Sequence, residues 1–529
     1  MKWFTAALAG LALIFVPTIG LQAADFDPEL HAKAADYQLF QETWHLTDLG
    51  AITGGMSFTD ETRTERSCLH HQGDSMIWTG MQLGSEALRY HITGDVAARD
   101  NVIALVQYMD AAMSITQTPG YIARFAGIDQ MPWNCATDKL ATDGKGPAKV
   151  LGEGEWEGYY WIDETSRDQY SGYIWGMTLA YDFVGDEPTR GIIREQFRQI
   201  GEMLVEHDWH IRDQNGEYTG NGAAWIGFGK RVAWLLAIAH VVDEPYYWNL
   251  LDEQYAQNKV LLPADVWSWY NHYAEFYGNN LRHLDFALIF RLWPDRTRLQ
   301  ELWDVWQKWN RPWTTAILNP WFDSIHASGC LRLGICDEAE MTQIVDDNER
   351  TLRLYWDAPS YRREVLCSTQ PLDPFSVWAD EFLRGIPWLE EIINIDPISA
   401  VPREINDRHW TDMYWQSSGV FDASCHSTAD PTYTGPGMDY LVAYWMNVYY
   451  GLLPGDGPYG DDDLIEPGDD DDTTDDDDDD NDDDDNDDTT GDDDDDNDDD
   501  AGDDDDDADD DDNDDNDDND NDDNGGGCG

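Results

Sequence analysis

The densest run of polar side chains in this sequence is WIDETSRDQY, at residues 161–170. It carries three carboxyl groups, on Asp163, Glu164 and Asp168. Two carboxyls, one protonated and one ionised, are what cleavage of a glycosidic bond requires. A carboxyl at a helix N-terminus meets partial positive charge, so we expect Asp168 to be the base and Asp163 or Glu164 the acid. The alternative is that Asp168 only caps the following helix and pairs with Arg167.

Two further loops carry side chains suited to holding a sugar. The sequence HHQGD places His71 and Asp74 before an apolar segment, where they can bind hydroxyl groups, although Asp74 can instead be an N-cap. Adjacent His side chains do not share a helix face, and no further ligand pattern is visible, so we expect no metal site. Arg124 follows the turn-forming Pro119-Gly120. Its planar fork suits a carboxylate or vicinal hydroxyls, or an ion pair with a neighbouring loop.

A fourth loop, residues 270–283, contains residue types that a uronate lyase uses. Such an enzyme needs a group that neutralises the acid and a base for the carbon-bound proton. Asn280 and His283 are the candidates in this loop. An isolated His is more often a hydrogen-bonded core group, and we favour that interpretation.

The sequence holds 25 Trp and 25 Tyr, and flat rings stack on the apolar faces of sugars. Trp303 and Trp306 lie at helical spacing, which indicates packing. Trp161 and Trp225, near predicted loop ends, are the stacking candidates. The predicted substrate-binding residues are His71, Asp74, Arg124, Trp161, Arg167, Tyr170, Trp225, Asn280 and His283.

The elements that must position these residues follow a repeated pattern. Four times, an apolar segment ends at a turn centred on an Asp and an amphipathic segment follows: Asp95, Asp186, Asp243 and Asp295. Asp at an N-cap satisfies the free N–H groups of a helix start. After the turns, apolar residues recur at helical spacing, whereas segments such as 225–242 are apolar nearly all round. The pattern predicts helical hairpins with a buried inner and an amphipathic outer helix.

The hairpins are expected to close into a ring. A fifth is expected within residues 336–356, and the terminal segments 34–46 and 439–453 are expected to pair. No linker interrupts the chain between residues 25 and 455, a length above the roughly 250–300 residues that one core supports. A ring avoids that limit because each hairpin packs only on its neighbours. We therefore predict an all-α fold, an (α/α)-toroid of about six hairpins, over residues 25–456.

Several blocks of the sequence resemble a known group of proteins. They are GDSMIWTGMQLGSEALRYHITGD, PGYIARF, YYWIDETSRDQYSGYIWGMTLAYD, NPWFDSIHASG, ADEFLRGIPW and GPGMDYLVAYWMNVYYGLL, in this order between residues 68 and 453. The ordered series is similar to six-hairpin, glycosidase-like domains of exported bacterial proteins, many of which have no assigned activity. The resemblance implies a fold and a carbohydrate-related function, with no defined catalytic pair to transfer.

Both ends of the chain indicate export. Residues 1–24 have a basic start, an apolar run and small residues before a polar stretch, which is typical of a secretory signal peptide; an uncleaved anchor is the alternative. No other segment resembles a membrane span. Six Cys lie between residues 68 and 425, so up to three disulfides are expected, and Cys330 and Cys336 are close enough to form a small loop.

The C-terminal tail, residues 457–529, is a low-complexity segment. Residues 461–529 hold 43 Asp, one Glu and no Lys or Arg, which predicts a disordered, self-repelling spacer. No cofactor is expected beyond loose Ca²⁺ association, because the regular calcium-loop pattern is absent. The ending Gly-Gly-Gly-Cys-Gly resembles the start of a C-terminal sorting segment, so Cys528 is either a surface attachment point or a free thiol.

These observations favour an exported carbohydrate-active protein that hydrolyses a neutral saccharide through two carboxylates. The first 460 residues hold 64 acidic and 32 basic side chains, and this excess repels polyanions, nucleic acid included. A non-catalytic glycan-binding or structural module is the first alternative, and a polysaccharide lyase is the second.

Overall fold

The computed structural model describes residues 26–135, 147–219, 227–273, 277–366, 369–386, 395, 397–408, 419–421, 423, 426–427 and 429–455. The predicted signal peptide, the Asp-rich tail and Trp225 lie outside these residues, as do Cys367, Cys425 and Cys528. The described residues belong to one compact unit, residues 1–470.

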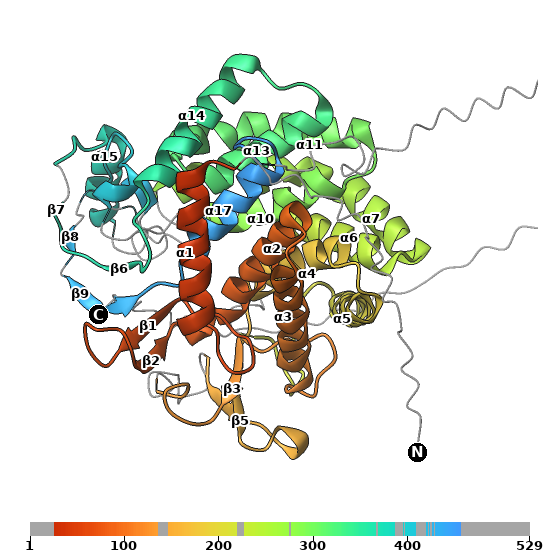
Figure 1. Ribbon diagram of the computed structural model, residues 1–529. Coiled ribbons are helices and arrows are strands. Elements are labelled where there is room, and N and C mark those ends of the chain that lie inside the picture. Colours follow the sequence, from red (N-terminus) through yellow and green to blue (C-terminus); the bar gives the residue numbers. More distant parts are fainter. Residues whose placement is uncertain are drawn as a thin grey trace, which may run out of the picture. The chain divides into compact units, whose positions relative to one another are not determined.

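Six helices in the described part of the chain are buried almost all round, and each contacts the next in a cyclic order. They are α2 (Ser75–Thr93), α4 (Arg167–Phe183), α6 (Phe228–Val242), α10 (Tyr277–Leu292), α13 (Pro320–Leu333) and α17 (Met438–Tyr449), and α17 contacts α2 again (Figure 1). The apolar composition of these segments explains their burial, because every side of such a helix must be covered. We call them the inner helices.

Helices with one apolar stripe pack on the inner helices. They are α1 (Pro28–Trp44), α3 (Val96–Ser114), α5 (Glu187–Glu206), α7 (Pro245–Asn258), α11 (Arg296–Trp309) and α14 (Glu338–Leu354). In α5, for example, Ile193, Phe197, Ile200 and Leu204 are fully buried. The expected pairing of the terminal segments is present, since α1 contacts α17, and Figure 1 shows the two side by side.

Three of the four Asp turns are N-caps, as predicted. The carboxylates of Asp95, Asp186 and Asp295 accept hydrogen bonds from backbone N–H groups in the first turns of α3, α5 and α11. The prediction for Asp243 was wrong. Asp243 ends α6 with a φ of 54°, in the left-handed region, and Glu244 precedes α7. Only Asp243 and Glu244 lie between α6 and α7 in the turn VVDEP. Asp243 is needed to end α6, so Glu244 takes the N-cap position of α7.

The chain is mostly helical, but the expectation of an all-α fold was too simple, because small antiparallel sheets are present. One sheet has the order β2-β1-β9-β6 and a second the order β3-β5-β4, while β7 pairs with β8. Extended loops between the helices pair because their backbone N–H and C=O groups need partners. The strands are β1 (Gly55–Phe58), β2 (Arg66–His70), β3 (Phe125–Ile128), β4 (Lys149–Leu151), β5 (Tyr159–Ile162), β6 (Tyr361–Arg362), β7 (Val365–Leu366), β8 (His426–Ser427) and β9 (Asp430–Thr434).

The closest approach between inner helices joins α2 to α4. Gly80 of α2 lies against the backbone of Gly172 in α4, and Gly176 of α4 lies against the backbone of Gly80. A Cβ atom on Gly80 or Gly176 would overlap the facing main chain. Small residues four apart on each helix therefore let the two backbones touch, which brings the N-terminus of α2 beside that of α4.

The C-terminal ends of the inner helices are closed by polar and aromatic contacts. The carboxylate of Asp182 lies 2.7 Å from His240 Nε2 and 2.5 Å from Arg291 Nη1, joining α4, α6 and α10. The ring of His91 stacks on Phe183 at 4.1 Å between centroids. These contacts join the C-terminal ends of α2, α4, α6 and α10.

Two disulfides are present among the described cysteines. They join Cys68 to Cys135 and Cys330 to Cys336, the second being the small loop expected from the sequence. In the described part of the chain, no helix is both long enough and apolar enough to span a bilayer.

Candidate functional site

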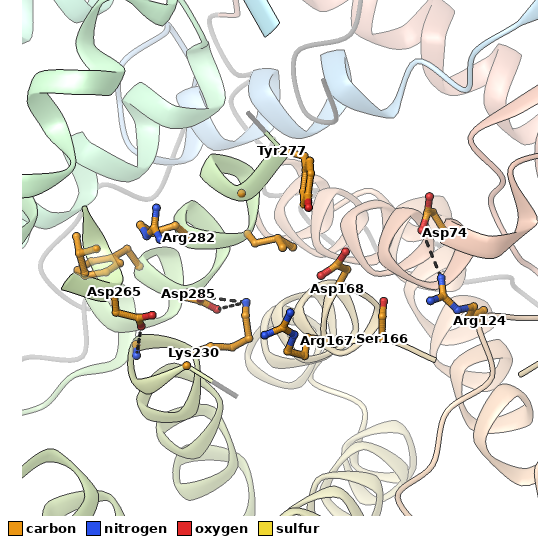
Figure 2. Close-up of a pocket in the computed structure, with 16 residues that line it drawn as sticks. Asp74, Arg124, Ser166, Arg167, Asp168, Lys230, Asp265, Tyr277, Arg282 and Asp285 are labelled. Carbon is orange, nitrogen blue, oxygen red and sulfur yellow. Dashed lines mark hydrogen bonds and ion pairs between the residues drawn. The ribbon is translucent and has the colours of Figure 1, made fainter. Parts of the chain in front are cut away.

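A cavity of about 570 Å³ lies at the N-terminal ends of α2, α4, α6 and α10 (Figure 2). It is bounded on one side by the short helix α8 (Leu262–Val266). Four carboxyl groups and four cationic side chains line it: Asp74, Asp168, Asp265, Asp285, Arg124, Arg167, Lys230 and Arg282. The N-terminal ends of the helices add partial positive charge, so the cavity is much less acidic than the body of the protein.

Asp74 is the carboxyl at the start of α2. Asp74 occupies the N-cap position of α2, as the capping interpretation expected, although its side chain makes no capping hydrogen bond. Its Oδ1 instead lies 3.6 Å from Arg124 Nη1 and accepts a hydrogen bond of 3.2 Å from Gln169 Nε2. The side chain is 41% exposed, with the two donors on its buried side. Arg124 and Gln169 therefore fix the position of the Asp74 carboxyl at the edge of the cavity.

Arg124 is buried where the chain enters β3. Its Nε donates to the carbonyl of Glu164 at 2.6 Å and its Nη1 to the carbonyl of Gly73 at 2.8 Å. Its guanidinium therefore holds the loops before α2 and α4 together. The alternative considered from the sequence, an ion pair with a neighbouring loop, is the arrangement that the structure contains.

Asp168 lies in the first turn of α4, and its carboxyl points into the cavity (Figure 2). Within the described residues it accepts no hydrogen bond and forms no ion pair. Burial raises the pKa of Asp168 above its ordinary value; Lys230 opposes this shift and the negative charge of Asp74 adds to it. The expected helix-terminus effect is therefore outweighed, and Asp168 is suited to be the acid rather than the base.

Lys230 and Asp285 form a buried pair beside Asp168. Lys230 Nζ lies 3.1 Å and 3.2 Å from the two Asp285 oxygens and donates to Ser171 Oγ at 2.9 Å. Burial raises the pKa of Asp285 to about 6, although Lys230 lowers it. Asp285 is therefore a second carboxyl of the cavity whose pKa is raised by burial.

The remaining charged groups shape the walls. Asp265 of α8 accepts a hydrogen bond from the Gly229 N–H, in the first turn of α6, and so serves that helix as a cap from another element. Arg282 Nη1 donates to Ser268 Oγ at 3.2 Å and to Asn271 Oδ1 at 2.7 Å. The ring of Tyr277 stands over the cavity opposite Asp168 (Figure 2).

The structure brings together four of the residues predicted from the sequence, namely Asp74, Arg124, Arg167 and Asp168. Asp163 and Glu164 do not line this cavity. The Asp163 carboxylate accepts the Ala148 N–H at 2.7 Å and so secures the start of β4, while burial raises its pKa. Glu164 adopts a φ of 53° and contributes its carbonyl to Arg124.

Three predicted binding residues serve the packing around the cavity. His71 is exposed and lies edge-on to the Tyr433 ring, at 6.4 Å between centroids. Trp161 is buried within β5, so it cannot stack on a ligand in the open cavity. Tyr170 is fully buried and donates to the carbonyl of Gly120 at 2.7 Å.

The two candidates on α10 are buried behind the cavity. His283 donates from Nδ1 to the Asn279 carbonyl at 2.7 Å, and its ring stacks on Phe322 at 3.6 Å between centroids. Burial lowers the pKa of His283 well below its ordinary value, so it is a neutral core group. Asn280 is fully buried and its amide has no hydrogen-bond partner in the described structure.

Sequence reasoning missed Lys230, Asp265, Arg282 and Asp285. It searched the loops before the inner helices, whereas Lys230 and Asp285 lie within the helices. A usable signal was present. A charged residue inside an otherwise apolar helix, as in FGKRVAWLL and HLDFALIF, needs a partner, and here the two residues are partners of each other.

No group of three or more His, Cys, Asp or Glu side chains arranged to hold a metal ion occurs in the described ranges.

No family model matches the sequence. No curated protein matches it either. Among solved structures, a sugar epimerase from a ruminal bacterium aligns with 80% of this chain and 98% of its own, at a TM-score of 0.32 and 11% identity. A TM-score this low does not establish a shared fold.

Proposed function

We propose that the protein hydrolyses glycosidic bonds in a neutral poly- or oligosaccharide, with Asp168 as the general acid and Asp74 as the second carboxylate. The observation that carries this proposal is the contrast between two carboxyls in one cavity. Among the described residues, Asp168 has no hydrogen-bond or ion-pair partner and its pKa is raised, whereas Asp74 is held by Arg124 and Gln169. Glycosidic cleavage needs one carboxyl that donates a proton and a second that attacks or activates water, and the cavity offers a carboxyl for each role.

In this reaction, Asp168 donates its proton to the glycosidic oxygen as the bond to the anomeric carbon breaks. The Asp74 carboxylate then attacks that carbon, or removes a proton from the water that attacks it. Arg124 and Gln169 hold the Asp74 carboxyl in place. The balanced charge of the cavity supports a neutral substrate, because no uncompensated cationic patch lines it to hold a polyanion.

The arrangement of the helices supports the same proposal. The cyclic contacts of the inner helices, with an amphipathic helix on each, support an (α/α)-toroid with the site at the N-terminal ends of its inner helices. The two disulfides support export to an oxidising compartment. We further propose that the protein binds its saccharide outside the cell and that the tail is a spacer or a surface attachment.

The test is a panel of neutral and uronate-containing polysaccharides, assayed for new reducing ends and for the ultraviolet absorbance of unsaturated products. We expect reducing ends without that absorbance. Asp168→Asn and Asp74→Asn should each lower kcat by about 10²–10⁴-fold while saccharide binding persists. The loss in Asp168→Asn should be smaller on an aryl glycoside, whose leaving group needs little protonation.

Asp163→Asn is the matched control, since Asp163 has a raised pKa but lies outside the cavity lining. It should keep its turnover. Loss of turnover in Asp163→Asn but not in Asp168→Asn would show that Asp163 is the acid, as expected from the sequence, and that Asp168 is not. Binding without turnover by the unmodified protein would favour the glycan-binding module, and unsaturated products would favour the lyase.

A further inference from the structure

Five aromatic rings form a continuous row outside the cavity. Trp267 and Trp269, around the start of α9 (Trp269–Tyr273), have centroids 5.5 Å apart and an interplanar angle of 23°. Trp269 lies 5.7 Å from Phe375 of α15 (Pro374–Arg384), and Phe375 lies 5.7 Å from Trp378. Trp378 stacks on Phe382 at 5.4 Å and 16°. We call this row the aromatic ledge.

The outer rings of the ledge face solvent. Trp267 is 44%, Trp378 56% and Phe382 48% exposed. Trp378 and Phe382 are four residues apart, so they share the outward face of α15, while Ser376, Ala379 and Leu383 are buried on the other side. Outward faces of amphipathic helices are normally polar, as in α5 and α14. A contiguous exposed apolar surface of this kind marks a binding site.

The ledge begins at the wall of the cavity. Trp267 directly follows Val266, which lines the cavity with Asp265. Arg282, on the same wall, donates to Ser268, which lies between Trp267 and Trp269, and to Asn271, two residues after Trp269. A ligand that leaves the cavity past Arg282 therefore meets Trp267 first.

The chemistry of the ledge fits a saccharide. Its rings form two stacked, nearly parallel pairs, Trp267 with Trp269 and Trp378 with Phe382, and the outer faces of these pairs are flat apolar surfaces that suit the C–H faces of sugar rings. Asp380 is paired with Arg384 at 2.7 Å, and the exposed Glu381 next to Phe382 in sequence can accept hydrogen bonds from hydroxyl groups. The acidic body of the protein disfavours an anionic lipid surface.

We infer that the aromatic ledge binds successive sugar rings of a polysaccharide chain whose reacting unit occupies the cavity. This inference rests on the proposed function for the identity of the cavity. It makes the natural substrate a long chain rather than a free disaccharide, because the ledge extends beyond the space that one or two sugar units fill.

The test uses the full-length chain and the double variant Trp378→Ala/Phe382→Ala. Both side chains are exposed, so the thermal unfolding midpoint should stay within about 2 °C. Affinity electrophoresis in gels containing neutral polysaccharides should show about tenfold weaker binding, which is the expected effect of losing two stacking rings. KM for the polysaccharide should rise, with kcat and the hydrolysis of short oligosaccharides unchanged.

Two further variants make the result specific. Trp378→Tyr/Phe382→Tyr keeps two flat rings and should retain binding. Tyr246→Ala removes a ring of α7 that is 54% exposed and lies far from α15 in Figure 1, and it should change nothing. Asp168→Asn separates the two proposals, because it should lose turnover and keep polysaccharide binding.

The outcomes are distinguishable. If the unmodified protein binds polysaccharide without turnover and the ledge variant does not bind, the ledge stands and the hydrolase proposal fails. Unchanged polysaccharide binding in the ledge variant overturns the ledge, as does absence of binding to every polysaccharide by the unmodified protein. A ledge variant that changes only the sedimentation coefficient assigns the ledge to a protein interface and also overturns the inference.

Discussion

At the scale of single residues, the protonation state of Asp168 decides what the cavity can do. The sequence correctly placed Asp168 at a helix start, where the helix dipole favours the ionised form. In the folded chain, burial and the charge of Asp74 outweigh that effect and raise the pKa of Asp168. Desolvation depends on side chains that are distant in sequence, so no local pattern around Asp168 contains it.

A substitution of Lys230 tests the protonation state of Asp168. Its positive charge lowers the pKa of Asp168, so Lys230→Met should raise that pKa further. An acid with a higher pKa stays protonated to higher pH, and the alkaline limb of kcat/KM should therefore move up by about one pH unit. The measurement is a pH–rate profile on a neutral oligosaccharide.

Lys259→Met serves as the control for this profile, since Lys259 is exposed and pairs with Glu301 on the surface. Its alkaline limb should coincide with that of the unmodified protein. A limb that stays in place or moves to lower pH in Lys230→Met would show that Asp168 is not the acid.

At the scale of elements, the contact between α2 and α4 sets the distance between the two carboxyls. Asp74 and Asp168 stand at the N-termini of these helices, and Gly80, Gly172 and Gly176 allow the backbones to touch. Gly80→Ala should lower the free energy of unfolding by about 1–3 kcal/mol, because its methyl group overlaps the α4 main chain. Urea unfolding measures this change, and kcat should fall in the same variant.

Gly191 of α5 offers the opposite case on a helix of similar length. A Cβ atom there meets nothing within 4 Å, so Gly191→Ala should stabilise the protein by about 0.5–1 kcal/mol. Equal effects of the two substitutions would mean that the close approach of α2 and α4 does not matter to stability.

The elements also show where sequence reasoning works and where it stops. Helix caps and apolar periodicity are local, so the turns at Asp95, Asp186 and Asp295 were predicted correctly. The small sheets were missed because strands such as β1 and β9 pair across nearly the whole chain, and each is short. Trp161 was misjudged for the same reason, since its burial comes from the partner strands β3 and β4.

At the scale of the whole molecule, charge is distributed unevenly. The first 460 residues carry twice as many acidic as basic side chains, yet the cavity holds equal numbers of each. The amino-acid composition therefore indicates the net charge of the body of the protein but does not indicate the charge of the cavity. The charged residues that line the cavity are spread along the chain from Asp74 to Asp285, and the closed arrangement of the inner helices brings them together.

The disulfides connect this arrangement to the proposed export. Cys68–Cys135 closes a loop with a sequence separation of 67, and Cys330–Cys336 one of 6. Because loop closure restricts the unfolded chain, the longer cross-link should contribute about 4 kcal/mol to the free energy of unfolding and the shorter about 2 kcal/mol. The longer one also ties β2 to the segment of Trp133, whose carbonyl accepts hydrogen bonds from Gln72 and Tyr160 beside the start of α2.

Cys68→Ser/Cys135→Ser should accordingly be the more destabilising double variant, and it should also lower kcat through the displaced start of α2. Cys330→Ser/Cys336→Ser should lose stability without that effect on turnover, since its loop joins α13 to α14 at the far end of α13 from the cavity. Urea midpoints and kcat measured side by side decide between these outcomes. The reverse ranking would show that the rim of the cavity is held by helix packing alone.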